Sequence, residues 1–245
     1  MKARVGLFVL GSVLLAFLLV GCGESGQIAS ETSPEEEPTP TPPGATSEMS
    51  IDEAIARGDI DSVRRILAEH PEAADTGANP RLPPLHAAIL RKKPRIATIL
   101  IEAGADVSAV DSNERTAIHL VVERDLPELV EPLAKAGAPL SSLDSVGWTP
   151  LHWAAAKDNL PLAKVLIEAG ADTDARTARG GTILHEAAAT GSGEMVRYFL
   201  RLGVDPTVVA SDGGTALEVA RDFENVAAIK ILEAQGNAAA NTATP

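Results

Sequence analysis

The pattern of apolar and polar positions between residues 149 and 170 predicts two short helices. Apolar side chains recur there at the three- and four-residue spacing of a helix face, namely Leu151, Ala154 and Ala155, then Ala163, Leu166 and Ile167. Thr149 suits the N-cap of the first helix, Pro150 fills its first position, and Gly170 suits a left-handed cap after the second helix. Neither helix can bury its apolar face alone, so the pattern predicts that such helix pairs stack.

The same pattern returns every 33 residues, which indicates a stacked repeat protein. The repeated glycines are Gly104, Gly137, Gly170, Gly203 and Gly236, and the repeated threonines are Thr116, Thr149, Thr182 and Thr215. Residues 50–71 and 211–236 are looser terminal units, which gives six units between residues 49 and 236. Pro132 falls within one predicted second helix, which it should shorten or kink.

One unit carries a family resemblance. Residues 144–175, with the sequence DSVGWTPLHWAAAKDNLPLAKVLIEAGADTDA, resemble an ankyrin repeat almost position by position, and looser copies begin at Arg81, Asp111 and Thr177. The resemblance implies an all-α ankyrin-repeat solenoid of about six stacked helix-turn-helix units with extended connecting turns. It also implies a protein–protein interaction module, because ankyrin repeats share a scaffold and differ in their partners. The partner itself is not implied.

Four histidines share one position of the repeat. In the last unit this position holds Glu218, which forms a capping-box sequence with Thr215. We therefore predict that each histidine caps its helix together with the threonine three residues before it, as the ankyrin resemblance also implies. The predicted capping residues are His86, Thr116, His119, Thr149, His152, Thr182, His185, Thr215 and Glu218. Pro83 replaces the threonine in one unit, so His86 lacks the usual partner.

A metal-binding or catalytic role fits these histidines poorly. Stacked helices lie about 8–10 Å apart, whereas a zinc–nitrogen bond is about 2 Å long, so successive histidines cannot share an ion. The stretch HEAAA at residues 185–189 begins like a zinc-protease motif but has Ala189 where the second histidine is required. No local cluster pairs a nucleophile with a base. We expect no enzyme activity, no metal and no cofactor.

The ankyrin resemblance places a partner surface on the turn tips and on the adjoining end of each first helix. The matching residues are Ser112, Asn113, Arg115, Glu123, Arg124, Ser145, Val146, Trp148, Lys157 and Arg179, with Ala156 and Thr190 beside them. Trp148 stands out because neither the cap nor the helix core needs a tryptophan there, and aromatic side chains are enriched among binding hot spots. Local packing over Pro150 is the alternative for Trp148. Trp153 is expected in the core between units.

The N-terminus has the features of a bacterial lipoprotein signal. Two basic residues precede the apolar run of residues 5–20, which is short for a membrane span. The sequence LVGC, which ends at Cys22, resembles a lipobox. It implies that residues 1–21 are removed and that Cys22 is lipidated. Gly23 stands in place of the aspartate that retains many such proteins in the inner membrane, which favours the outer membrane if the organism has one.

Composition separates a tether and a tail from the repeats. Residues 22–48 hold six glutamates and five prolines but one bulky apolar side chain, which predicts a disordered tether. Residues 237–245 are predicted to be a frayed tail. The net charge of −13 disfavours nucleic acid and anionic lipid headgroups as partners of the folded part.

Together these features predict a membrane-anchored, monomeric module that binds an unidentified protein outside the cytoplasm, on the periplasmic or surface face of the envelope. Two other roles stay open. The chain is then either a structural spacer of the envelope, or an inhibitor or immunity protein against a secreted toxin or enzyme.

Overall fold

The computed structural model describes residues 49–211 and 213–242, with side chains up to residue 236. The predicted signal peptide, Cys22, the predicted tether and residues 243–245 lie outside these residues. Every helix named below belongs to the unit Ser50–Pro245. Among the helices of the described ranges, none has the length and apolar content needed to cross a membrane.

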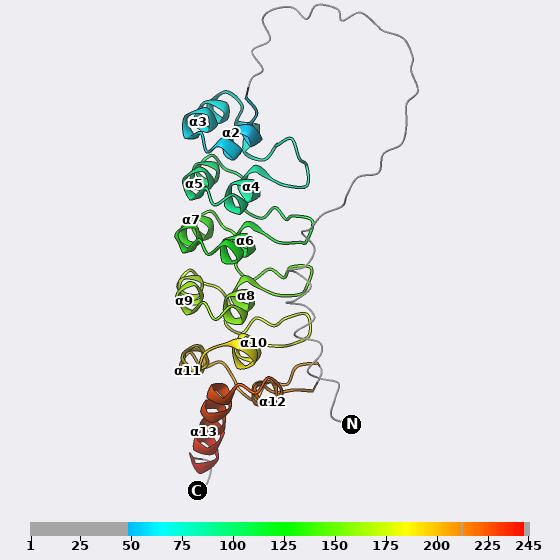
Figure 1. The fold of residues 1–245 in the computed structure, drawn as a ribbon, viewed down its shortest axis with the longest axis vertical. Helices are drawn as coiled ribbons and strands as arrows, with labels where there is room; N and C mark the ends of the chain where they lie inside the picture. The colour runs from blue at the N-terminus through cyan, green and yellow to red at the C-terminus, as the bar shows by residue number, and fades with distance from the viewer. Residues whose placement is uncertain (1–48, 212, 243–245) are drawn as a thin grey trace, which may run out of the picture. The chain divides into compact units, whose positions relative to one another are not determined.

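The described residues form twelve α-helices in six consecutive pairs. The first helices of the pairs are α2 (Ile51–Arg57), α4 (Pro84–Leu90), α6 (Ala117–Arg124), α8 (Pro150–Ala156), α10 (Ile183–Thr190) and α12 (Ala216–Asp222). The second helices are α3 (Ile60–Glu69), α5 (Pro94–Glu102), α7 (Val130–Lys135), α9 (Leu160–Glu168), α11 (Gly193–Arg201) and α13 (Val226–Thr242). Figure 1 shows the first helices in one column, the inner helices, beside a column of second helices, the outer helices; the loops project beyond the inner column. The predicted all-α solenoid of six stacked units is confirmed.

The core is narrow and lies between the helices of adjacent pairs. Leu151, Ala154 and Ala155 of α8 are fully buried, as are Ala163 and Leu166 of α9. α8 contacts α6 on one side and α10 on the other. Small alanine side chains let the inner helices approach closely, and each pair buries its apolar face only against its neighbours.

Four glycines at the repeat spacing end the outer helices in a left-handed conformation. Gly104, Gly137, Gly170 and Gly203 have φ values of +89°, +88°, +102° and +89°. A Cβ atom at any of these positions would meet nothing within 4 Å. The backbone conformation, and not a lack of space, therefore selects glycine here.

The last outer helix differs from the prediction. An end at Gly236 and a frayed tail from residue 237 were expected, but α13 continues through Gly236 to Thr242. Three alanines follow within four residues of Gly236, and alanine is the strongest helix former. Because nothing after the glycine stops the helix, the helical region extends beyond residue 236.

Pro132 interrupts the outer column, as predicted. The outer segment of that pair is divided into the 3-10 helix η2 (Pro127–Leu129) and α7, which has only 6 residues. Pro132 lies in the first turn of α7, where its missing N–H has no helical partner to lose. A second 3-10 helix, η1 (Pro71–Ala74), follows α3.

Candidate partner-binding surface

His119 and His185 each cap a helix and link two units of the stack. Nδ1 of His119 lies 3.2 Å from the backbone nitrogen of Thr116 and 2.9 Å from its hydroxyl oxygen, while Nε2 lies 3.1 Å from the carbonyl oxygen of Trp148 in the next unit. His185 repeats this arrangement with Thr182 and the carbonyl of Gly214, at 3.1, 2.9 and 3.2 Å. A carbonyl oxygen can only accept, so Nε2 carries the proton and Nδ1 is the acceptor. The sequence predicted the cap but not the bond to the next unit.

Two of the histidines depart from this arrangement. His86 reaches the carbonyl of Arg115 at 3.1 Å, but its Nδ1 has no hydrogen-bond partner among the described residues because Pro83 offers neither a hydroxyl nor an N–H. His152 bonds the Thr149 hydroxyl at 2.7 Å. Burial lowers the pKa of His152, and the carbonyl of Gly181 in the next unit offsets part of that shift. The Nε2 atom nevertheless makes no hydrogen bond of normal geometry with any described residue. The contact to the next unit is therefore looser at His152.

The histidines are neutral structural groups. Burial lowers the pKa of His86 and His119 below the usual value, and lowers the pKa of His152 to about 4. In the last unit Glu218 takes the same place and accepts the backbone N–H of Thr215 at 2.7 Å. No cluster of three or more metal-ligating side chains occurs in the part of the chain that the structure describes. This arrangement holds units together and leaves no imidazole nitrogen of His119 or His185 for a ligand.

The loops are joined to one another along the stack. The backbone N–H of Ser145 donates to the carbonyl of Asn113 at 3.0 Å, that of Ala178 to Gly147 at 2.9 Å, and that of Ser211 to Arg179 at 2.8 Å. The tips that the sequence assigned to partner binding thus use their backbones to fix the next loop. The loop backbones are therefore ordered before a partner binds, which lowers the entropic cost of binding. We call this row of loops the loop edge.

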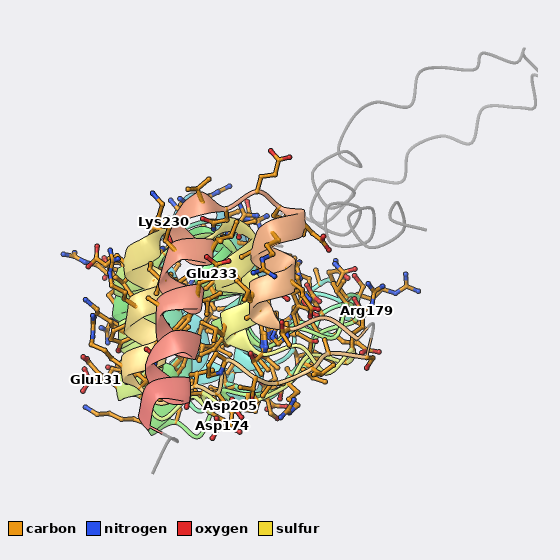
Figure 2. All side chains as sticks on the ribbon, turned by 90° about the horizontal axis from the view of Figure 1, so that it is seen from below. Glu131, Asp174, Arg179, Asp205, Lys230 and Glu233 are labelled. Carbon is orange, nitrogen blue, oxygen red and sulfur yellow. The ribbon has the colours of Figure 1, made fainter. Side chains whose placement is uncertain are left out.

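Most of the predicted partner-binding side chains are exposed. The exposed ones are Ser112, Asn113, Glu123, Ser145, Val146, Lys157 and Arg179, and Arg115 and Arg124 are partly exposed. Figure 2 shows Arg179 at the loop edge and Glu131 of α7 at the opposite side of the stack.

The predicted cations Arg115, Arg124 and Lys157 are already engaged within the protein, and Arg124 pairs with Glu123 at 3.5 Å. Arg115 is 25 % exposed and donates to Asp111 Oδ2 from Nε at 2.9 Å and from Nη2 at 2.7 Å, and it also pairs with Glu123. Lys157 Nζ donates to the carbonyl of Glu123 at 2.9 Å, at the end of α6. The side chains of Arg115 and Lys157 therefore fix neighbouring elements, and a partner meets them in preset positions.

The two tryptophans are arranged differently from the prediction. Trp148, predicted as a partner-binding residue, is 8 % exposed, whereas Trp153, predicted in the core, is partly exposed. Their rings meet edge to face with centroids 5.0 Å apart. Asp144 holds both, because it accepts the Trp148 backbone N–H at 3.0 Å and the Trp153 indole N–H at 2.8 Å. Because Trp148 is buried and packs against Trp153, it belongs to the scaffold.

The sequence reasoning found one exposed apolar residue on the loops, Val146, and missed three others. Val110, Leu143 and Val209 are 52 %, 41 % and 56 % exposed, and Val146 is 46 % exposed. Val110, Leu143 and Val209 lie at multiples of the repeat spacing, each directly before a turn. That spacing was the signal that could have found them. We call Val110, Leu143, Val146 and Val209 the apolar row.

Glu186 in α10 was also missed. Glu186 is 9 % exposed, and Trp153 and Leu120 stand at the same repeat position one and two repeats earlier. A charged residue at an inward position of a helix breaks the repeat pattern, and this break was visible in the sequence.

Comparison with known families agrees with the fold. A family model of three ankyrin repeats matches residues 51–144 and 85–177, and a model of many ankyrin repeats matches residues 176–220. No curated protein matches this chain.

Two solved structures illustrate the likeness. An ankyrin repeat domain from Acinetobacter baumannii AYE is 28 % identical, with a TM-score of 0.70, over 78 % of this chain and 99 % of that chain. A chain of the complex between a predatory endopeptidase from Bdellovibrio bacteriovorus and an immunity protein is 22 % identical, with a TM-score of 0.67, over 77 % of this chain and 98 % of that chain. With matches that run from residue 51 to residue 220, the chain belongs to the ankyrin-repeat family.

Proposed function

We propose that this chain is a lipid-anchored protein of the bacterial envelope whose loop edge binds a partner protein outside the cytoplasm. Two features support the anchor: the basic and apolar N-terminus, and the LVGC sequence at Cys22. Membership of the ankyrin-repeat family supports protein binding. The proline- and glutamate-rich residues between Cys22 and the repeats would let the stack reach a partner away from the membrane surface.

The apolar row is the observation that carries the binding proposal. An isolated exposed apolar side chain is common, but four along one edge of hydrogen-bonded loops, with the exposed Arg176 between Leu143 and Val209, form a candidate interface. Val110 also lines a surface hollow of about 320 Å³ with Pro80 and Arg81 of the preceding loop. Because the loop backbones are ordered before binding, the free energy gained by burying this apolar area is not reduced by an entropic cost of ordering the loops.

Capture experiments with matched variants test this function. Val110, Leu143 and Val209 are replaced together by serine, and Leu202 and Val226, which are exposed apolar residues of the outer column and its turn, are replaced by serine as the control. All five side chains are exposed, so both variants should fold. Wild type and control should capture the same envelope protein, and the triple variant should capture at least ten-fold less. Equal capture by the triple variant would reject the loop edge as the interface.

The anchor has its own test. Cys22→Ala should accumulate as the unprocessed precursor and should incorporate no labelled fatty acid. Normal processing and labelling of this variant would show that Cys22 is not the lipid site.

Inhibition of a secreted hydrolase is a second candidate role. It is favoured by the fold similarity to the complex of an endopeptidase with an immunity protein. The captured partner should then be a hydrolase, and its activity should fall when wild type is added and recover with the triple variant. A partner without hydrolytic activity, or one whose activity is unchanged, would exclude this role and leave binding or scaffolding.

A further inference from the structure

Glu186 is a buried carboxylate without a partner. Glu186 as a whole residue is 9 % exposed to solvent. No hydrogen bond or neighbouring charge among the described residues acts on the Glu186 carboxylate. Its oxygens are not sealed from solvent, because the fully enclosed unpaired side-chain atoms of the described residues belong to His86, Arg124 and His152. Burial raises the pKa of Glu186 to about 7. Buried carboxylates are normally paired, because an unpaired one loses the free energy of hydration without compensation.

The position of Glu186 on α10 faces the loop edge. The equivalent residue of α8 is Trp153, and its indole N–H donates to Asp144 in the loop before α8. The equivalent loop residue before α10 is Thr177. Its hydroxyl oxygen accepts the backbone N–H of Gly181 at 3.0 Å and makes no bond to Glu186. The carboxylate therefore occupies a loop-facing site in which its own loop provides no partner.

The loop beside Glu186 also lacks a covering side chain. Gly181 stands where the two preceding units have Trp148 and Arg115. A Cβ atom on Gly181 would find its nearest atoms in Thr177 at 3.2 Å and His185 at 4.0 Å. A side chain as large as the tryptophan or arginine of the other units is thus missing from the loop that precedes α10, the helix of Glu186.

We propose that Glu186 receives a basic side chain, an arginine or a lysine, from the protein bound at the loop edge. The proposal rests on the proposed function and names the chemistry of the partner's anchor. A cation beside Glu186 completes a charge-assisted hydrogen bond that the free protein lacks. The partly exposed ring of Trp153 flanks the site one repeat earlier and can add a cation–π contact. Arg and Trp side chains are also enriched at the energetic centres of interfaces.

A small-molecule probe tests the site without the partner. The full mature chain, purified from membranes in detergent, is titrated with N-acetyl-arginine amide and with the uncharged N-acetyl-citrulline amide. Intrinsic fluorescence is the readout, because Trp148 and Trp153 are the 2 tryptophans of the chain. The arginine probe should change the fluorescence saturably, and Glu186→Gln should weaken its binding at least ten-fold.

Two controls decide the interpretation. Glu194→Gln removes an exposed carboxylate from α11, on the outer column, and should leave arginine binding unchanged. The citrulline probe should produce no saturable change. Equal binding of the arginine probe to wild type and Glu186→Gln, or no saturable binding to wild type, would overturn the proposal.

The captured partner provides the second arm. Glu186→Gln should bind it at least ten-fold more weakly than Glu194→Gln does. If the apolar-row triple variant loses the partner while Glu186→Gln retains it, the docking of a basic side chain at Glu186 is wrong and the proposed function stands. If Glu186→Gln loses the partner while the triple variant retains it, the basic anchor stands and the apolar row is wrong. If both variants retain it, both proposals are wrong.

Discussion

At the residue scale, the stability of the stack depends on how many hydrogen bonds each capping histidine makes. His119 has polar partners on both ring nitrogens, whereas His86 has one on Nε2 and none among the described residues on Nδ1. Replacement by alanine removes the same side chain at both positions. His119→Ala should therefore lower the free energy of unfolding by about 1 kcal/mol more than His86→Ala. Urea unfolding of the two variants measures this difference, and equal losses would mean that the threonine contacts contribute nothing.

Trp148 is expected to act as a scaffold residue. Trp148 is buried and packs against Trp153, and its backbone N–H donates a hydrogen bond to the Asp144 carboxylate. Trp148→Ala should lower the free energy of unfolding by about 3 kcal/mol, the usual cost of removing a large buried aromatic ring. Thermal unfolding tests this, with Val146→Ala as an exposed control in the same loop. A variant that melts like wild type would return Trp148 to the binding surface.

The residue scale also shows where sequence reasoning ended. The cap could be predicted because Glu218 occupies the histidine position within a recognisable Thr-x-x-Glu box. The hydrogen bond from the imidazole to the next unit could not be predicted, because every residue has a backbone carbonyl. The acceptors in this chain are the carbonyls of Arg115, Trp148 and Gly214. Asp144 accepts one hydrogen bond from the Trp148 backbone and one from the Trp153 indole, and neither bond has a signature in the pattern of apolar positions.

At the element scale, two glycines at the same repeat position have different roles. Gly203 ends α11 with φ of +89°, whereas Gly236 lies inside α13. Neither would bring a Cβ atom within 4 Å of another atom. Gly236→Ala should therefore raise the free energy of unfolding by about 0.5–1 kcal/mol, and Gly203→Ala should lower it by about 1 kcal/mol. Chemical denaturation should therefore show changes of opposite sign in the free energy of unfolding of the two variants. A lower free energy of unfolding for Gly236→Ala would mean that α13 ends at Gly236.

Helix positions were more predictable than helix ends. The apolar spacing located both helices of each pair, and Pro132 marked the break in the outer column. The extension of α13 was missed because the repeat spacing suggested a terminator at Gly236. A glycine ends a helix only when the backbone beyond it leaves the helical conformation. In this chain alanines follow Gly236, and the helical conformation continues through it.

At the scale of the whole molecule, pH acts on stability in two opposing directions. The pKa of His152 is lowered from 6.5 to about 4, so the unfolded chain binds its proton first and stability falls as pH drops through this window. His86 and His119 act in the same direction. Burial raises the pKa of Glu186 from 4.5 to about 7, so the folded protein binds this proton more tightly than the unfolded chain. The resulting stabilisation of the fold is present at low pH and is lost as pH rises through that range.

Replacing Glu186 by leucine separates the two effects. Leu120 shows that the repeat accepts leucine at this position. Glu186→Leu should raise the free energy of unfolding, and this increase should be about 3 kcal/mol larger at pH 8 than at pH 4. The reason is that burial penalises the charged carboxylate, which is the form present at pH 8. The loss on acidification should persist in the variant, since the histidines remain. Urea unfolding across this pH range tests both points, and a gain that does not change with pH would show that Glu186 is not desolvated.

The central claim is that a partner protein lies against the loop edge, and photo-crosslinking in the intact envelope tests it most directly. A photoreactive residue is placed at Val110 or Val209 on the loop edge, and at Leu202 or Val226 as equally apolar, exposed controls away from it. Val110 and Val209 should each give an adduct with the same protein, and the two control positions should give none. Adducts at Leu202 or Val226 with none at Val110 or Val209 would contradict the claim.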